Sequence, residues 1–143
     1  MQAVMTEAEL MAFMRRAFAQ VAEEFRVERL TADGIVMRLK VDDRHLRPGG
    51  TVSGPSIFAL ADVAVYLAIL ARIGPVALAV TTNGTVDFLR KPAAGVDLLA
   101  EARLLKLGRV LAVGDVLIRS EGSDAPVARS NMTYSIPPRR EQF

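Results

Sequence analysis

Apolar residues along this chain change their spacing several times, and each change marks a predicted element. Near the N-terminus they recur three and four positions apart, at Leu10, Met14, Ala17, Phe18 and Val21. This is the spacing of one face of a helix. Thr6 and Glu9 have the form of a capping box at its start. We therefore expect an N-terminal helix over residues 7–24.

Two short strands are predicted next, over residues 25–30 and 35–41. They flank Asp33-Gly34, a dipeptide typical of hairpin turns. The following segment, residues 42–50, is polar and ends in proline and glycine, so we expect a loop there.

An almost wholly apolar run extends from Ile57 to Leu70. A membrane span needs about 20 apolar residues, so this shorter run is typical of a buried helix. Either Ser53 or Gly54 can cap it, with a proline in the first turn. We expect the helix to end near Arg72.

After this helix the apolar spacing changes to two. Asn83-Gly84 would suit a hairpin turn, but the alternation continues through it. We favour one long strand over residues 78–88 with a bulge at Gly84, which places Thr81 on the opposite face from the apolar side chains. Three further strands are expected, over residues 96–105, 110–120 and 126–136.

Helices and strands in this order predict an α+β fold, an antiparallel sheet wrapped around a central buried helix. We expect a single domain over residues 1–143, with a core over 25–137 and a tail over 138–143. The outer face of the sheet would carry a partly apolar set that favours burial against a second subunit. Its members are Thr81, Leu99, Leu111 and Val113.

Composition narrows the function classes. Of 143 residues, 51% are hydrophobic and 24% charged, which excludes a disordered chain. There is no cysteine and one histidine, His45, so thiol nucleophiles, cysteine zinc sites and multi-histidine metal centres are excluded. The net charge is +2 without a basic stripe interleaved with aromatic residues, so we expect no nucleic-acid partner. No signal peptide or membrane span is predicted, so we expect a cytoplasmic protein.

Asp62 is unexpected because it lies within the apolar run. An isolated buried carboxylate costs several kcal/mol, so it needs either a partner or a function. Arg47 or the Tyr66 hydroxyl could pair with it. Alternatively, Asp62 belongs to a site in which amides at the glycine-rich helix start, residues 49–54, polarise a carbonyl oxygen. The local sequence leaves these two interpretations level.

Several segments together resemble one family. Residues 53–62, SGPSIFALAD, resemble the helix-start motif of hotdog-fold acyl-CoA thioesterases of the phenylacetate-degradation (PaaI-like) type. Residues 85–95, residues 100–109 and the stretch from Val127 to Tyr134 also resemble that family in order and spacing. The resemblance covers roughly residues 25–137.

The resemblance implies a hotdog fold and hydrolysis of a small or medium acyl- or aryl-CoA to an acid and CoA. It makes Asp62 the nucleophile or general base, and Gly54 the amide donor to the thioester carbonyl. Thr81 would come from the partner subunit and help to hold the water. Basic residues near the sheet edge would meet the CoA phosphates: Arg90, Lys91, Lys106 and Arg109. The resemblance also implies a homodimer or a dimer of dimers, and no cofactor apart from the CoA of the substrate.

The chain departs from the family pattern at three positions. Ser53 replaces the usual histidine, Pro55 a glycine, and Arg47 a frequent asparagine. Ser53 could donate a hydrogen bond in place of histidine, and Arg47 could keep Asp62 ionised. These departures also suit an alternative, a module that binds acyl-CoA without cleaving it. A dehydratase is disfavoured because His45, expected to be an exposed loop residue, does not fit the histidine pattern of those enzymes.

Overall fold

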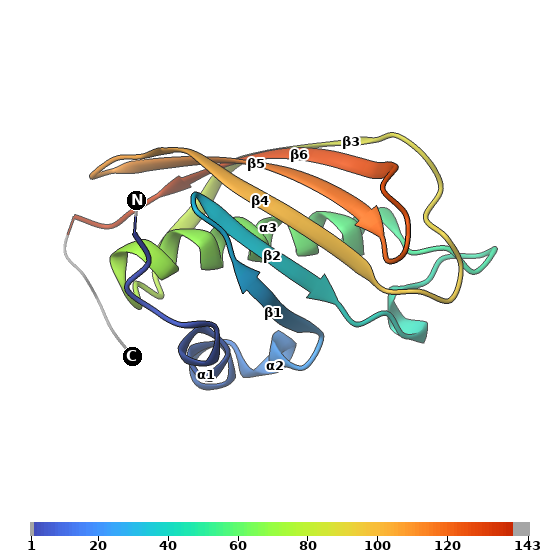
Figure 1. The fold of residues 1–143 in the computed structure, drawn as a ribbon, viewed down its shortest axis with the longest axis horizontal. Coiled ribbons are helices and arrows are strands. Elements are labelled where there is room, and N and C mark those ends of the chain that lie inside the picture. The colour runs from blue at the N-terminus through green and yellow to red at the C-terminus, as the bar shows by residue number, and fades with distance from the viewer. Residues whose placement is uncertain (1, 139–143) are drawn as a thin grey trace.

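One antiparallel sheet curves around a long helix (Figure 1). The computed structural model describes residues 2–138. The strands are β1 (Phe25–Leu30), β2 (Gly34–Leu39), β3 (Val80–Phe88), β4 (Leu98–Leu107), β5 (Leu111–Ser120) and β6 (Pro126–Ser135). They are hydrogen-bonded in the order β1-β2-β4-β5-β6-β3, and each pair is antiparallel. The predicted α+β arrangement is confirmed, while all but the first residue of the predicted tail lies outside the described residues.

The central helix α3 (Gly54–Ile73) forms the core, and every residue from Val63 to Arg72 is buried. Ser53 caps it, because its Oγ accepts a hydrogen bond from the Ser56 amide at 3.4 Å. By length and hydropathy alone α3 could cross a membrane, but 72% of its apolar stretch is buried inside the protein. The predicted buried core helix is therefore confirmed.

One side of α3 is not covered by the sheet. Pro55, Phe58 and Ala59 are exposed there, and Asp62, one turn further on, is half-buried. Residues spaced three and four apart share one face of a helix, so these four residues form a continuous strip, which we call the open stripe. Strand β3 runs beside the open stripe and ends the sheet, since β6 is its sole strand partner among the described residues.

The N-terminal helix is shorter than predicted. Helix α1 (Glu7–Ala17) starts with the expected capping box, in which the side chains and backbone amides of Thr6 and Glu9 bond reciprocally. At Phe18 the backbone leaves the helical region (φ −138°, ψ 45°), and a single turn, α2 (Ala19–Ala22), follows. The apolar spacing continues across this break because both helices turn an apolar side to the core, so the spacing alone could not reveal it.

Strand β3 is continuous as predicted, but its bulge lies elsewhere. The register with β6 shifts between Thr81 and Asn83, not at Gly84. Gly84 instead allows close packing, because a Cβ there would lie 2.7 Å from the Met132 Sδ and 3.1 Å from the Phe58 Cζ. The displaced bulge turns Thr81 toward α3, so its predicted place on the outer face is wrong.

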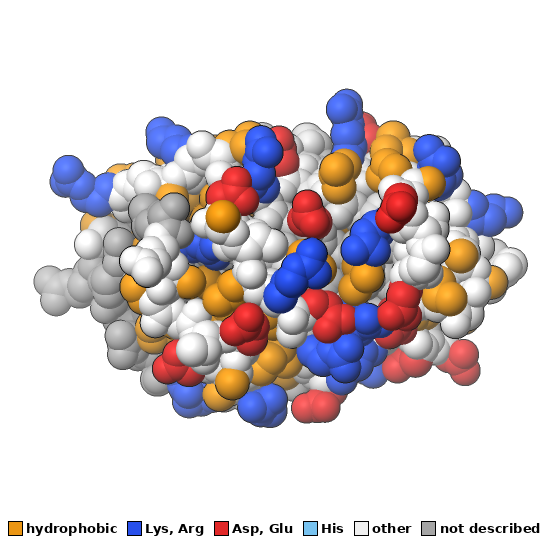
Figure 2. Space-filling view, viewed as in Figure 1, with side chains coloured by type: hydrophobic (Ala, Val, Ile, Leu, Met, Phe, Trp, Pro, Cys, Tyr) orange, Lys and Arg blue, Asp and Glu red, His pale blue; other side chains and the backbone are white. Residues whose placement is uncertain are grey.

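The outer face of the sheet is more polar than predicted. Three of the predicted apolar residues do reach the surface of this face: Leu111 is exposed, and Leu99 and Val113 are half-buried. Charged side chains lie among them, and a depression of about 500 Å³ on this face includes Glu101, Arg103, Asp115 and Arg129 in its lining. Figure 2 shows the same mixture of acidic, basic and hydrophobic side chains over the face viewed in Figure 1.

Candidate active site

The N-terminal end of α3 offers a free backbone amide. Pro55 has no amide hydrogen, and the Ser56 amide is bonded to Ser53. Among the described residues no acceptor bonds the Gly54 N–H. The unpaired amides of a helix N-terminus attract negative charge, so Gly54 can polarise a carbonyl oxygen. An open groove of about 540 Å³ lies beside it, lined by Gly54, Pro55, Phe58, Val86 and Phe88.

The hydroxyl of Ser53 is already engaged in the helix cap. Its oxygen accepts from the Ser56 amide and lies at hydrogen-bond distance, 3.1 Å, from the Ser56 Oγ. In this arrangement Ser53 fixes the direction in which α3 begins.

His45 holds the loop that leads to Gly54. Its expected exposure is wrong, since it is 3% exposed. The Nδ1 accepts from the Asp42 amide at 3.0 Å, so the hydrogen lies on Nε2, which is 2.7 Å from the Glu24 Oε1. The His45 carbonyl in turn accepts from the Ser53 amide at 2.7 Å. The sequence could not show this burial, because Glu24 lies 21 residues away along the chain.

Asp62 lies further along the open stripe and is held by two hydroxyl groups. Its Oδ1 accepts from the Thr81 Oγ1 at 2.6 Å and from the Tyr134 hydroxyl at 2.7 Å. The Tyr134 hydroxyl is also 3.0 Å from the Asp62 carbonyl oxygen. No described residue bonds the Oδ2, so this oxygen keeps its lone pairs for a ligand. Asp62 lines a cavity of about 400 Å³ with Tyr66, Thr81 and Tyr134.

Neither partner suggested by the sequence contacts Asp62. The Tyr66 hydroxyl donates to the Ala77 carbonyl at 3.0 Å. Arg47 is exposed in the loop before α3, where its amide bonds the Thr51 carbonyl. No ion pair within residues 2–138 includes Asp62. The carboxylate is held by neutral donors, which favours the interpretation that it serves a site.

Gly54 and Asp62 are too far apart to act on one carbonyl within a single chain. Eight residues of helix separate them, which corresponds to about 12 Å along the axis. Thr81, expected from a partner subunit, bonds the Asp62 of its own chain. One chain therefore carries two separate candidate groups, which we call half-sites: an amide at Gly54 and a carboxylate with two hydroxyl groups at Asp62.

Comparison with known proteins identifies the family. The sequence pattern of the thioesterase superfamily matches residues 49–139. The chain belongs to this superfamily. A crystal structure of a candidate thioesterase from Silicibacter sp. TM1040 is 61% identical, with 96% of each chain covered and a TM-score of 0.91. No curated protein matches the chain at a significant level.

Two more distant structures place this thioesterase among hotdog folds. A mutant of the phenylacetic acid degradation protein PaaI from Thermus thermophilus is 30% identical, with 88% of this chain and 99% of that chain covered and a TM-score of 0.68. A hypothetical thioesterase from Streptococcus pneumoniae, solved with coenzyme A, shares the fold at 20% identity, with 90% and 99% covered and a TM-score of 0.74. The predicted PaaI-like hotdog family is confirmed, and the chain is a thioester hydrolase.

Tyr134 is the partner of Asp62 that the sequence did not single out. It lies on the inner face of β6, in alternation with Met132, and is buried. A buried tyrosine hydroxyl needs a hydrogen-bond partner, so an inward-facing tyrosine on this strand could have indicated a polar partner in the core. Burial raises the pKa of Tyr134 well above its usual range, and the neighbouring Asp62 carboxylate raises it further. Tyr134 is therefore a stable hydrogen-bond donor to Asp62.

Both tyrosines of this thioesterase should titrate above their ordinary range. Burial raises the pKa of Tyr66 to about 12, and that of Tyr134 is raised as well. Folding thus favours the protonated phenols and stabilises the native state. This stabilisation is complete below the tyrosine pKa of the unfolded chain, about 10, and is lost as the pH rises through the tyrosine pKa values of the folded protein. We expect little phenolate absorbance near pH 10–11 until the protein unfolds, followed by absorbance from two tyrosines. A tyrosine that titrates normally while circular dichroism remains native would contradict this.

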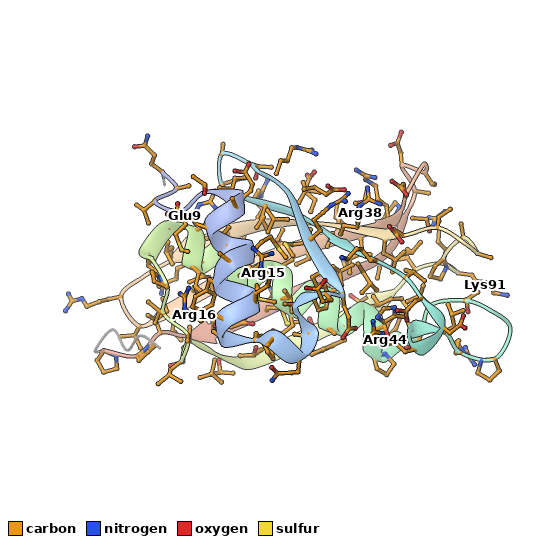
Figure 3. The ribbon with its side chains drawn as sticks, turned by 90° about the horizontal axis from the view of Figure 1, so that it is seen from below. Glu9, Arg15, Arg16, Arg38, Arg44 and Lys91 are labelled. Carbon is orange, nitrogen blue, oxygen red and sulfur yellow. The ribbon has the colours of Figure 1, made fainter. Side chains whose placement is uncertain are left out.

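The four basic residues expected to contact CoA form two separate pairs. Arg90 and Lys91 follow β3 at the Gly54 end, where the Arg90 Nε donates to the Pro126 carbonyl at 2.8 Å. Lys91 and Arg44 lie at this same end in Figure 3. Lys106 and Arg109 lie at the β4–β5 hairpin, next to the opposite end of β6. Nine residue steps of β6 lie between Pro126 and Ser135, or about 30 Å, so one chain does not gather all four.

Proposed function

We propose that this thioesterase hydrolyses acyl-CoA at a site that combines the Gly54 amide of one copy with the Asp62 carboxylate of a second. The observation that carries the proposal is the carboxylate on the open stripe of α3, which is held by Thr81 and Tyr134 and keeps a free Oδ2. The coenzyme A in the Streptococcus pneumoniae relative supports the CoA thioester as substrate.

The chemistry needs a base or nucleophile and a polarising amide. Acting as a base, the Asp62 Oδ2 takes a proton from water while the water oxygen bonds the thioester carbon. The Gly54 N–H stabilises the negative charge that develops on the carbonyl oxygen. The C–S bond then breaks, and the thiolate takes the proton, which yields a carboxylic acid and CoA. Acting as a nucleophile, the same oxygen would attack the thioester carbon and displace the CoA thiolate. Water would then cleave the resulting anhydride, which restores the Asp62 carboxylate, releases the acid and supplies the proton that the thiolate takes.

The geometry of α3 and β3 favours assembly about a two-fold axis. Phe58 lies midway between Gly54 and Asp62, so two α3 helices that cross antiparallel at Phe58 bring each Gly54 next to the Asp62 of the other copy. Gly84 is the middle residue of β3, and a Cβ there would lie 3.1 Å from the Phe58 ring. One axis beside Phe58 and Gly84 therefore pairs the two helices and also the two β3 edges.

Exposed apolar surface at this place supports such a dimer. Phe58, Val80 and Phe88 are 39%, 55% and 57% exposed, and all three flank the edge of β3. Pairing of two β3 strands would satisfy their unpaired backbone groups and cover these side chains. A dimer of dimers through the outer sheet face stays a prediction that light scattering can test.

Thiol release from acyl-CoA tests the proposed function. Purified protein is given aliphatic and aryl acyl-CoAs, and free CoA is measured with a thiol reagent. We expect turnover that saturates with substrate. The alternative, an acyl-CoA-binding module, gains support from Ser53, whose hydroxyl is used in the helix cap. That alternative predicts saturable CoA binding with no thiol release on any substrate.

Charge reversal at Lys91 should weaken substrate binding without slowing the chemical step. Lys91 is exposed at the Gly54 end, where we place the CoA phosphates. A phosphate contact is equally strong in the ground and transition states, so Lys91→Glu should raise KM several-fold and leave kcat nearly unchanged. Added salt should reduce the difference. Arg29→Glu is the matched control, since Arg29 is exposed on β1 at the far edge of the sheet. Equal KM values for the two variants would remove this assignment.

A further inference from the structure

The cavity beside Asp62 is partly built by the N-terminal helices. Its lining includes Ala17, Phe18 and Gln20 from the break between α1 and α2. The apolar walls are completed by Tyr66 of α3, by Leu78 just before β3 and by Val80 at the start of β3. Asp62 is the one charged side chain of the lining. A space of about 400 Å³ is within the range of cavities that hold small organic groups.

The break at Phe18 creates this wall. A helix that continued straight from α1 would carry the following residues along its own axis, whereas the non-helical backbone at Phe18 redirects the chain into α2. Phe18 and Ala17 are half-buried, and Gln20 is exposed at the cavity. We call residues 17–20 the corner.

The corner is attached to a rigid base. Leu10, Phe13 and Met14 of α1 are almost completely buried. The Phe13 ring lies 6.4 Å from that of Tyr66, which lies 6.0 Å from that of Tyr134. Since Tyr134 also bonds Asp62, a continuous series of packed side chains fixes α1 relative to the carboxylate. A wall held in this way can discriminate between ligands by size.

The orientation of a bound thioester follows from the proposed function, on which this inference rests. Arg90 and Lys91 lie at the Gly54 end, so the CoA part extends from the thioester toward that half-site. The acyl part must then extend from the carbonyl carbon in the other direction, past Asp62. The apolar cavity that lies there is bounded by the corner.

We propose that the corner determines which acyl chains this thioesterase accepts, with Phe18 and Gln20 as specificity-determining residues. The cavity takes an apolar acyl group of medium length, and Phe18 limits how far the chain can extend. Neither side chain takes part in bond making or breaking, so both act on the choice of substrate and not on the reaction itself.

The test compares kcat/KM for dodecanoyl-CoA and hexanoyl-CoA in each variant. Phe18→Ala should raise the dodecanoyl to hexanoyl ratio by about 10-fold or more, because several methylene groups gain space. Gln20→Trp adds volume from an exposed position and should lower the ratio by a similar factor. A ratio taken on one enzyme sample is independent of the folded fraction, so partial unfolding of Phe18→Ala does not obscure the result. Leu117→Ala, an apolar truncation at an exposed outer-face position, is the matched control and should leave the ratio unchanged.

The outcomes separate this inference from the proposed function. Opposite shifts of the ratio in the two corner variants support it. Hydrolysis by the native protein with unchanged ratios in both variants overturns the role of the corner and leaves the proposed function standing. Failure of the native protein to hydrolyse any acyl-CoA overturns both.

Discussion

Asp62→Asn is expected to lower kcat for acyl-CoA hydrolysis by about 10²–10⁴-fold, the range for loss of a general acid–base group. Asparagine keeps one carbonyl-type oxygen, which can still accept from Thr81 and Tyr134 in place of the Oδ1. The amide nitrogen replaces the free Oδ2 and can neither take a proton nor attack a carbon. Substrate binding should therefore persist while turnover is lost.

The melting temperature of this variant should stay level or rise. No cation contacts Asp62 in the described structure, so neutralising it leaves no buried positive charge without a partner. A partly buried charge is also removed. Asp33→Asn is the matched control, since Asp33 is exposed in the turn between β1 and β2 and pairs with Arg103 at 3.7 Å, and it should retain full activity. Full activity in Asp62→Asn would end the proposed mechanism.

Mixing two inactive variants is expected to restore activity if the site spans two copies. Gly54→Pro removes the polarising amide, and the preceding Ser53 is already extended (φ −72°, ψ 155°), as a residue before proline prefers. The new ring meets the flexible end of Phe88, 3.3 Å from the position of a Cβ. A mixed dimer contains one Gly54→Pro copy and one Asp62→Asn copy. One of its two sites then carries both mutations, and the other combines a native Gly54 with a native Asp62.

Random mixing should yield about a quarter of the native activity, since about half of the dimers are mixed and each has one intact site. Co-expression with two affinity tags allows the mixed dimer to be isolated, and its activity should be about half of the native value. Asp62→Asn carrying both tags is the control for the tagging procedure. If the mixed dimer is no more active than its parents, the half-sites do not combine across the dimer.

Local patterns predicted the elements on which the site rests. The apolar run with Ser53 before it predicted α3, and a single charge in that run identified Asp62. The sequence also contained the distance between the two residues, because eight residues of helix from Gly54 to Asp62 correspond to about 12 Å. The family motif, in which both residues stand together, drew attention away from this distance. The two residues could therefore have been assigned to separate half-sites from the sequence.

What the sequence could not predict depends on contacts between distant segments. Tyr134 reaches Asp62 across 72 residues, and no spacing rule links them. The bulge before Asn83 decides which way Thr81 points, and a one-residue shift in register exchanges the two faces of a strand. The break at Phe18 leaves the apolar spacing intact, so the spacing does not reveal it. The position of the break is set by packing against β1 and α3 and not by local helix propensity.

The free edge of β3 has a consequence for the newly made chain. A copy that has folded but not yet formed the dimer presents a nine-residue strand with one unpaired edge, which carries exposed phenylalanine and valine side chains. Such an edge is a template for aggregation. In the proposed dimer, the step that completes the catalytic site also removes this edge. Selection for catalysis and selection for solubility would then act on the same nine residues, and substitutions in β3 should reduce the yield of native protein together with its activity.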